Sequence, residues 1–218
     1  MKVSDRTFVI FLIVCCFYLL FFLIGLIVSR RRETDVATLV RIGNYLVDPL
    51  SKSIHRKMRP YKHRCLVRKK WPALFVLIFL NNLLVVAFIQ HVLYGVVFFM
   101  PLVLVSWYGF GHGVLFSKRS IRSEFAVVFV EFLGYLIASS IGVQIGLALL
   151  KAVLTSGPVS ISVPWQPVLL STFYILLAAL LETIELSKGN YENRGKNLEI
   201  YLDEARRDEF HKKLNDRD

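Results

Sequence analysis

The fold is decided by residues 7–28, which read TFVIFLIVCCFYLLFFLIGLIV and are followed almost at once by Arg30, Arg31 and Arg32. A helix needs about 20 apolar residues to cross the hydrocarbon core of a bilayer, and this uncharged run supplies that length. The run is longer than the apolar core of a signal peptide, and no small-x-small cleavage site follows it. We therefore expect it to stay in the chain as a transmembrane helix.

The rest of the chain predicts four more spans. Residues 72–116 are long and apolar enough for two helices joined by a tight hairpin near Gln90–Gly95, while residues 125–153 and 168–186 supply one helix each. The composition agrees, because 55% of the 218 residues are hydrophobic and the mean hydropathy is +0.54. Such a chain is too apolar for a plain soluble domain. The predicted fold class is all-α, a polytopic membrane helix bundle with five transmembrane helices.

The distribution of positive charge predicts the topology. Of the 27 Lys and Arg residues, 13 lie in the loop from Arg30 to Lys70, three in the loop 118–122, and eight in the tail from Lys188. With five spans these 24 residues share one side, and only Lys2, Arg6 and Lys151 lie on the other. Because cytoplasmic loops carry the excess of Lys and Arg, we expect a cell-membrane protein with its N-terminus outside and its C-terminus in the cytoplasm.

These features divide the chain into four parts. They are an N-terminal transmembrane helix (1–29), a basic cytoplasmic loop (30–70), a four-helix membrane core (71–187) and a charged cytoplasmic tail (188–218). In the loop, residues 36–50 place apolar side chains at helical spacing, which predicts an amphipathic helix that Gly43 interrupts and Pro49 bends or ends.

Basic residues of the loop form a candidate surface for anionic lipid or a partner. It consists of Arg30, Arg31, Arg32, Arg56, Lys57, Arg59, Arg68, Lys69 and Lys70. Contact with anionic headgroups is the favoured interpretation. The alternative is a docking surface for RNA, a ribosome or an acidic protein, although Tyr61 stands alone among the aromatic residues of the basic stretch.

Small residues mark two helix-packing faces. Gly109 and Gly113 lie four residues apart in the third predicted span. In the fourth span, small residues recur every fourth position, at Gly134, Ala138, Gly142 and Gly146. Small residues at this spacing let another helix backbone approach closely inside a membrane. We expect tight packing within the bundle or between copies of the chain.

Five polar residues lie where hydrocarbon is expected. They are Asn81, Asn82, His112, Glu131 and Glu182. Such residues are costly in a span and usually face the bundle interior. We expect a polar cluster in the cytoplasmic half of the bundle. Two interpretations stay open, a structural one in which these groups hydrogen-bond neighbouring helices, and a functional one in which they relay protons or ions.

Three segments resemble the SpoIIM (stage II sporulation protein M) family of integral membrane proteins. The first is FLNNLLVVA at 79–87 with Gly95, Pro101 and the Gly109/Gly113 pair. The others are VEFLGYLIASSIG at 130–142, continuing to Gly146, and LLAALLETIE at 176–185. Tyr108 departs from the family pattern, in which Asn precedes the glycine, and the Pro-His-Gly that often leads into the glutamate helix is missing. The resemblance covers residues 75–185 and implies a membrane protein without known catalytic residues, whose sporulation members recruit or anchor partners.

Three function classes follow. The chain has no GxxxxGK[ST], GxSxG or HExxH motif, so we predict no enzyme, no catalytic residues, no cofactor and no metal site. The favoured prediction is a SpoIIM-type scaffold that binds other membrane proteins or copies of itself. The first alternative is a transporter subunit that uses Glu131, His112 and Glu182. The second is a membrane-protein insertase whose basic loop docks a ribosome, although the first span lacks the Arg of a typical bacterial insertase groove.

Overall fold

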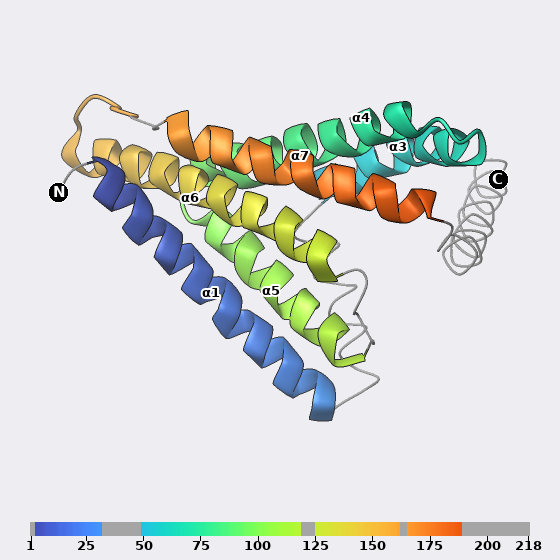
Figure 1. Cartoon of the computed structure of the whole chain (residues 1–218). Coiled ribbons are helices and arrows are strands. Elements are labelled where there is room, and N and C mark those ends of the chain that lie inside the picture. Colours follow the sequence, from blue (N-terminus) through green and yellow to red (C-terminus); the bar gives the residue numbers. More distant parts are fainter. Residues whose placement is uncertain (1–2, 32–48, 119–124, 162–164, 189–218) are drawn as a thin grey trace, which may run out of the picture. The chain divides into compact units, whose positions relative to one another are not determined.

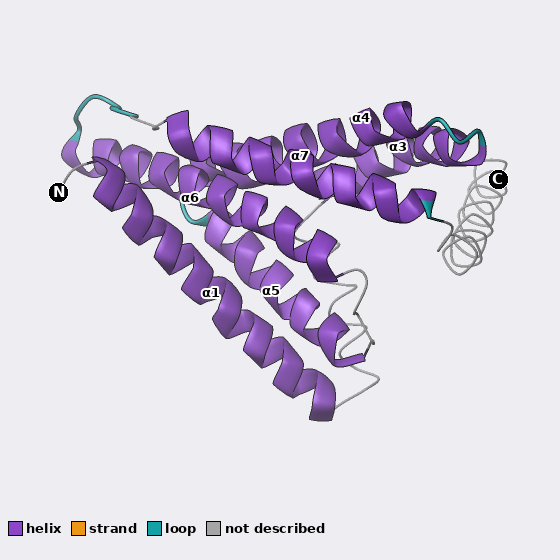
Figure 2. Cartoon of the chain, in the orientation of Figure 1, coloured by secondary structure: helices purple, strands orange, loops and turns teal. Residues whose placement is uncertain are grey.

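The computed structural model describes residues 3–31, 49–118, 125–161 and 165–188. Every regular element in these ranges is a helix (Figures 1 and 2). The elements in chain order are α1 (Val3–Arg31), α3 (Pro49–Val67), α4 (Trp71–Leu80), η1 (Asn81–Val92), η2 (Leu93–Val97), α5 (Met100–Lys118), α6 (Phe125–Thr155) and α7 (Trp165–Ser187).

Four stretches of the described chain are long and apolar enough to cross a bilayer. They are Arg6–Arg30, Trp71–Val97, Val127–Thr155 and Trp165–Ser187. The all-helical class is therefore confirmed for the described residues, and four of the five expected spans coincide with helices that are long and apolar enough to cross a membrane. The fifth expected span, α5, is not among these four stretches.

The hairpin expected near Gln90–Gly95 is wrong. Helix α4 continues without a break into the π-helix η1 and then into the short 3₁₀-helix η2. The turn comes later, at Phe98, whose φ of 47° reverses the chain before α5 begins. Gln90 and His91 look like turn residues because they are polar, but they lie inside the span and are 1% and 0% exposed.

Two pairs of helices run parallel inside the first compact unit, residues 1–180. In the first pair, Gly109 of α5 lies against Tyr18 of α1, and Gly113 lies against Phe22 one turn later. In the second pair, η1–η2 follows the same direction as α6. Figure 1 shows α1 and α5 side by side along most of α5.

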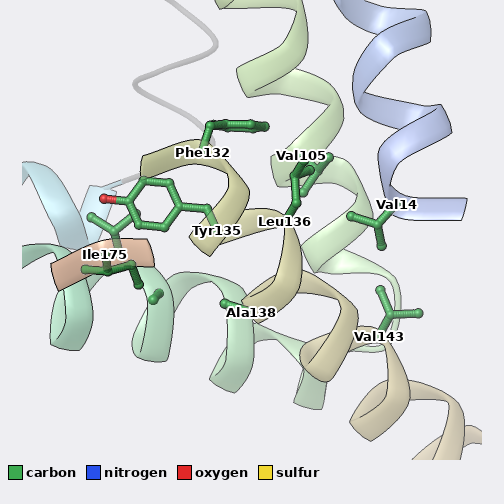
Figure 3. Packing of buried hydrophobic residues seen from close by; sticks show 10 residues of the cluster. Val14, Val105, Phe132, Tyr135, Leu136, Ala138, Val143 and Ile175 are labelled. Atoms are coloured by element: carbon green, nitrogen blue, oxygen red, sulfur yellow. The ribbon is translucent and has the colours of Figure 1, made fainter. Parts of the chain in front are cut away.

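The apolar core lies where α1, η1, α5 and α6 meet. It includes Val14 of α1 and Val105 of α5, both 0% exposed, together with Phe132, Leu136 and Val143 of α6. Figure 3 shows these side chains directed into the space between the helices. The long helix α6 therefore contributes the central face of the unit, against which the others pack.

Part of the basic loop is helical. Helix α3 begins at Pro49, a position that tolerates proline because the first helical N–H has no intrahelical partner. It ends in a Schellman motif, in which the amides of Lys69 and Lys70 donate to the carbonyls of Leu66 and Cys65. Most of the amphipathic helix expected over residues 36–50 lies outside the described residues.

Helix α7 crosses from the first compact unit into the second, residues 181–218. Within the first unit, Ser171 of α7 is buried and donates a hydrogen bond of 2.8 Å to the carbonyl of Gly134. Of the second unit the structure describes residues 181–188, which form the end of α7 and one turn residue. The predicted tail beyond residue 188 lies outside the described residues.

Candidate functional site

A chain of polar side chains joins η1 to α6. Asn82 donates to Oε1 of Glu131 at 2.6 Å, and the hydroxyl of Tyr135 donates to the same oxygen at 2.6 Å. Asn81 in turn donates to Oδ1 of Asn82 at 3.0 Å. Both asparagines are buried and Glu131 is half-buried. The structure thus brings together three of the five predicted polar residues, and adds Tyr135 to them.

Tyr135 belongs to this chain because of helical spacing. It follows Glu131 by four residues, so the two side chains lie one above the other on the same face of α6. Ser139 continues that face by one further turn. Glu131, Tyr135 and Ser139 therefore form a polar stripe that runs beside the small-residue stripe of the same helix.

A second polar contact lies farther along the same pair of helices. Nδ1 of His91 is 2.6 Å from the hydroxyl oxygen of Ser139. The His91 ring stacks on Tyr135, with centroids 5.5 Å apart and planes inclined by 14°. Nε2 of His91 is buried and has no hydrogen-bond partner within the described residues.

His112 lies in a separate group between α5 and α1. Its Nδ1 is 3.1 Å from the hydroxyl oxygen of Tyr18. The Tyr18 ring packs on Phe132, with centroids 4.2 Å apart, and the His112 ring meets Phe132 edge-on at 5.0 Å. His112 therefore holds α5 to α1, and an aromatic ring separates it from the polar chain of Glu131.

The fifth predicted polar residue, Glu182, lies on the last turns of α7. It belongs to the second compact unit and is half-buried. Glu182 is therefore not grouped with the polar residues of the first unit. Of the five predicted polar residues, Asn81, Asn82, His112 and Glu131 thus make the polar contacts described in the first unit.

Both small-residue faces lie against another helix. Carbonyl oxygens of α1 face Gly109 and Gly113, and those of η1 and the turn face Gly142 and Gly146. Gly134 lies instead against Ile175 and Ser171 of α7, and Ala138 is 2% exposed in the core. The neighbouring backbones therefore lie so close to these glycines that a larger side chain there would overlap them.

The basic surface is described in part. Arg30, Lys57, Arg68, Lys69 and Lys70 are exposed. The side chains of Arg31, Arg56 and Arg59, together with all of Arg32, lie outside what the structure describes. Arg30 lies near the end of α1 and Lys57 lies on α3. Arg68, Lys69 and Lys70 lie between α3 and α4.

The arrangement is suited to holding helices together. A carboxylate with two donors at 2.6 Å is fixed in position, and each donor comes from a defined turn of a helix. No group of three or more His, Cys, Asp or Glu side chains that could hold a metal ion occurs within the described residues. Hydrogen bonds across helices of this kind fix the register of a membrane bundle.

Sequence reasoning missed four hydrogen-bonding or stacking residues of these groups, Tyr18, His91, Tyr135 and Ser139. One signal was available for His91, because an ionisable residue inside an apolar run usually faces the bundle interior. The expected hairpin hid it by placing His91 at a membrane surface. Tyr135 could be found from its spacing to Glu131, whereas Ser139 resembles the other small residues of α6.

Comparisons with family models, with curated proteins and with solved structures find no match to this chain.

Proposed function

We propose that this chain is a five-span membrane scaffold, of the SpoIIM type that its sequence resembles, which organises partner proteins at the cell membrane. One observation carries the proposal. The half-buried Glu131, in the second turn of α6, accepts hydrogen bonds from both Asn82 and Tyr135, so it serves to fix α6 against η1. A scaffold needs such a rigid core, because partner surfaces stay in place only if the helices that carry them do.

The direction of α5 supports five spans. Helix α5 lies parallel to α1, so its ends face the same two sides as the ends of an undisputed span. Its 19 residues extend about 28 Å, close to the thickness of the hydrocarbon core. If α5 did not cross, the 27 basic residues would divide 14 to 13 between the two sides instead of 24 to 3. Only the five-span arrangement gives a strong positive-inside bias.

Cysteine labelling tests this topology. In a background with Cys15, Cys16 and Cys65 replaced by Ser, Lys70→Cys and Ser160→Cys each introduce one thiol at an exposed position. With five spans, a membrane-impermeant maleimide applied to intact cells labels position 160 and labels position 70 only after permeabilisation. Labelling of both positions under the same condition shows that α5 does not cross.

The exposed basic residues and the helix surfaces are the proposed contact sites. Lys57, Arg68 and Lys69 provide positive charge for anionic headgroups or an acidic partner segment. Leu12, Leu19 and Leu23 of α1 are exposed along its outer side, where lipid or another membrane helix is the apolar neighbour. Partners are therefore expected to be membrane proteins, including a second copy of this chain.

Affinity purification after in-cell crosslinking tests the scaffold. The triple variant Lys57→Gln, Arg68→Gln, Lys69→Gln removes exposed basic residues, and Lys151→Gln serves as a charge control at the other end of the bundle. The scaffold predicts stoichiometric membrane partners that the triple variant loses and the control keeps. Recovery of ribosomes and nascent chains instead would favour an insertase.

A transporter subunit remains the second candidate, because two buried atoms favour it. Oδ1 of Asn81 and Nε2 of His91 have no hydrogen-bond partner within the described residues. A moving proton or small cation would supply one for Oδ1, and also for Nε2 in the tautomer in which Nδ1 donates to Ser139. Glu131→Gln separates the candidates, since glutamine keeps an acceptor oxygen for Asn82 and Tyr135. The scaffold predicts that this variant keeps its partners and its cellular phenotype. Loss of the phenotype with the partner complex intact favours transport.

A further inference from the structure

A cavity opens between α1 and α6 at the end of the bundle where α1 begins and α6 ends. Its volume is about 600 Å³, within the range of small-ligand sites. Arg6 of α1 and Lys151 of α6 both line it, and both side chains are exposed. They are two of the three cations that the sequence places on this side of the membrane, and the cavity brings them together from different helices.

A third donor lies in the same wall. Gln144 lines the cavity, and its Oε1 accepts a hydrogen bond of 3.3 Å from the hydroxyl of Thr7. Its Nε2 is buried and has no acceptor within the described residues. Because the carbonyl oxygen of this amide is already engaged, the unpartnered group of Gln144 is the donor Nε2, which becomes accessible to a ligand only if the side chain turns toward the cavity. Two cations and an amide donor together recognise an anion.

The helix ends around the cavity are compatible with an anion. Helix α1 begins here, so the positive end of its dipole faces this side. Helix α6 ends here, but two of its last carbonyls are engaged. The amide of Gly157 donates to the carbonyl of Ala152 at 3.1 Å, and the hydroxyl of Thr155 donates to that of Lys151 at 2.9 Å. The described side chains that line the cavity include no carboxylate.

The rest of the lining is apolar. Ile10, Leu147 and Ile161 line the same cavity as the two cations. A fully hydrated ion gains nothing from such side chains, whereas a lipid can place its phosphate on the donors and its chain on the apolar wall. The two halves of the lining thus match the two halves of a phospholipid.

We propose that this cavity binds the phosphate of an anionic phospholipid, with Arg6, Lys151 and Nε2 of Gln144 as its donors. The inference needs the chain in a bilayer but does not depend on the scaffold function. It assigns two of the three basic residues expected on this side, Arg6 and Lys151, to one site. General attraction of cations to a charged membrane would not require Arg6 and Lys151, from two different helices, to line the same cavity.

Titration of the purified full-length chain with phosphatidylglycerol, followed by native mass spectrometry, tests the site. We expect one saturable lipid adduct that phosphatidylcholine does not reproduce. Arg6→Gln and Lys151→Gln should each weaken it about tenfold, because each removes one charge-assisted contact. The control Lys188→Gln removes an exposed cation that belongs neither to the cavity nor to the basic surface, and it should leave the adduct unchanged.

Charge-conserving variants guard against a simple failure to fold. Arg6→Lys and Lys151→Arg should retain the adduct, and an equal loss in them and in the Gln variants would overturn the assignment. Equal binding by the wild type and both Gln variants would overturn it as well. Inorganic phosphate at millimolar concentration distinguishes the source of the anion. If phosphate alone raises the thermal stability of the wild type and displaces the lipid, the anion site stands but the lipid is not its ligand.

Discussion

The contact between α1 and α5 leads to a quantitative prediction about glycine. A methyl group at Gly109 would lie 2.5 Å from the carbonyl oxygen of Tyr18 and 3.3 Å from the amide nitrogen of Phe22. Both are backbone atoms, so no side-chain rotation relieves the clash. An ordinary contact begins at 3.4 Å, so the helices must separate by about 0.9 Å at this point.

Separation of this size has two consequences for stability. A gap of about 0.5–1 Å forfeits a quarter to a half of the dispersion energy of the atoms it separates. The hydrogen bond between Tyr18 and His112, now 3.1 Å, also stretches beyond bonding distance and costs about 0.6 kcal/mol, the average for such bonds in membranes. Together with the usual cost of overpacking, Gly109→Ala should destabilise the protein by about 2 kcal/mol. This is about a 30-fold change in the unfolding equilibrium.

The same helix supplies the control. Gly111 lies between the two packed glycines, and a methyl group there would meet no atom within 4 Å. Both substitutions change helix propensity equally, so their difference isolates the contact with α1. Unfolding by added SDS in mixed micelles, followed by tryptophan fluorescence, gives the two free energies. Equal stability of Gly109→Ala and Gly111→Ala would show that this contact does not hold the helices together.

Two further predictions concern single bonds and backbone strain. Ser171→Ala removes the hydrogen bond between α7 and the carbonyl of Gly134 and should cost about 0.6–1.7 kcal/mol in the same unfolding assay. Thr172→Ala, whose hydroxyl bonds within α7, should cost less, and an equal loss would contradict the role of Ser171. Lys69→Gly should stabilise the chain by about 1 kcal/mol, because Lys69 adopts a φ of 51° at the end of α3. Lys70→Gly, at a φ of −84°, should give no such gain in the thermal midpoint.

The apolar spans could be predicted because the bilayer imposes their length. Four stretches of the sequence satisfy that condition by composition alone, and the structure contains a helix at each of them. Gly109, Gly113 and His112 hold α5 to α1, and these contacts cannot be read from length and composition.

The side chain that each polar residue contacts could not be predicted, because the two residues of each pair come from helices that lie far apart in the sequence. Asn82 and Glu131 are 49 residues apart, and His91 and Ser139 are 48 apart. A single sequence shows that each residue is polar but not which residue it meets. Gly95 was misjudged for the same reason. It was assigned to a turn, whereas its Cα faces the carbonyl of Gly142.

The two parallel helix pairs share one arrangement, which explains where the glycines occur. Parallel neighbours place the like ends of their dipoles side by side, an unfavourable arrangement that some other interaction must offset. In these pairs the atom nearest to a methyl group placed on each packed glycine would be a carbonyl oxygen of the other helix or, at Gly146, of the turn residue Phe98. This holds for Gly25, Gly109 and Gly113 in one pair and for Gly95, Gly142 and Gly146 in the other.

Carbonyl oxygens at such positions accept weak hydrogen bonds from Cα–H groups, each worth about 0.5–1 kcal/mol. Gly134, in the antiparallel contact with α7, lies closest to the side chain of Ile175 instead. The glycines thus allow close backbone contact between parallel helices, whose dipoles oppose association. Several registers are compatible with such glycine faces, and the hydrogen bonds of Glu131 and His91 select one of them. Replacing one of these glycines should therefore lower the stability of the protein. Removing one of these hydrogen bonds should lower the stability and also allow η1 and α6 to shift relative to each other.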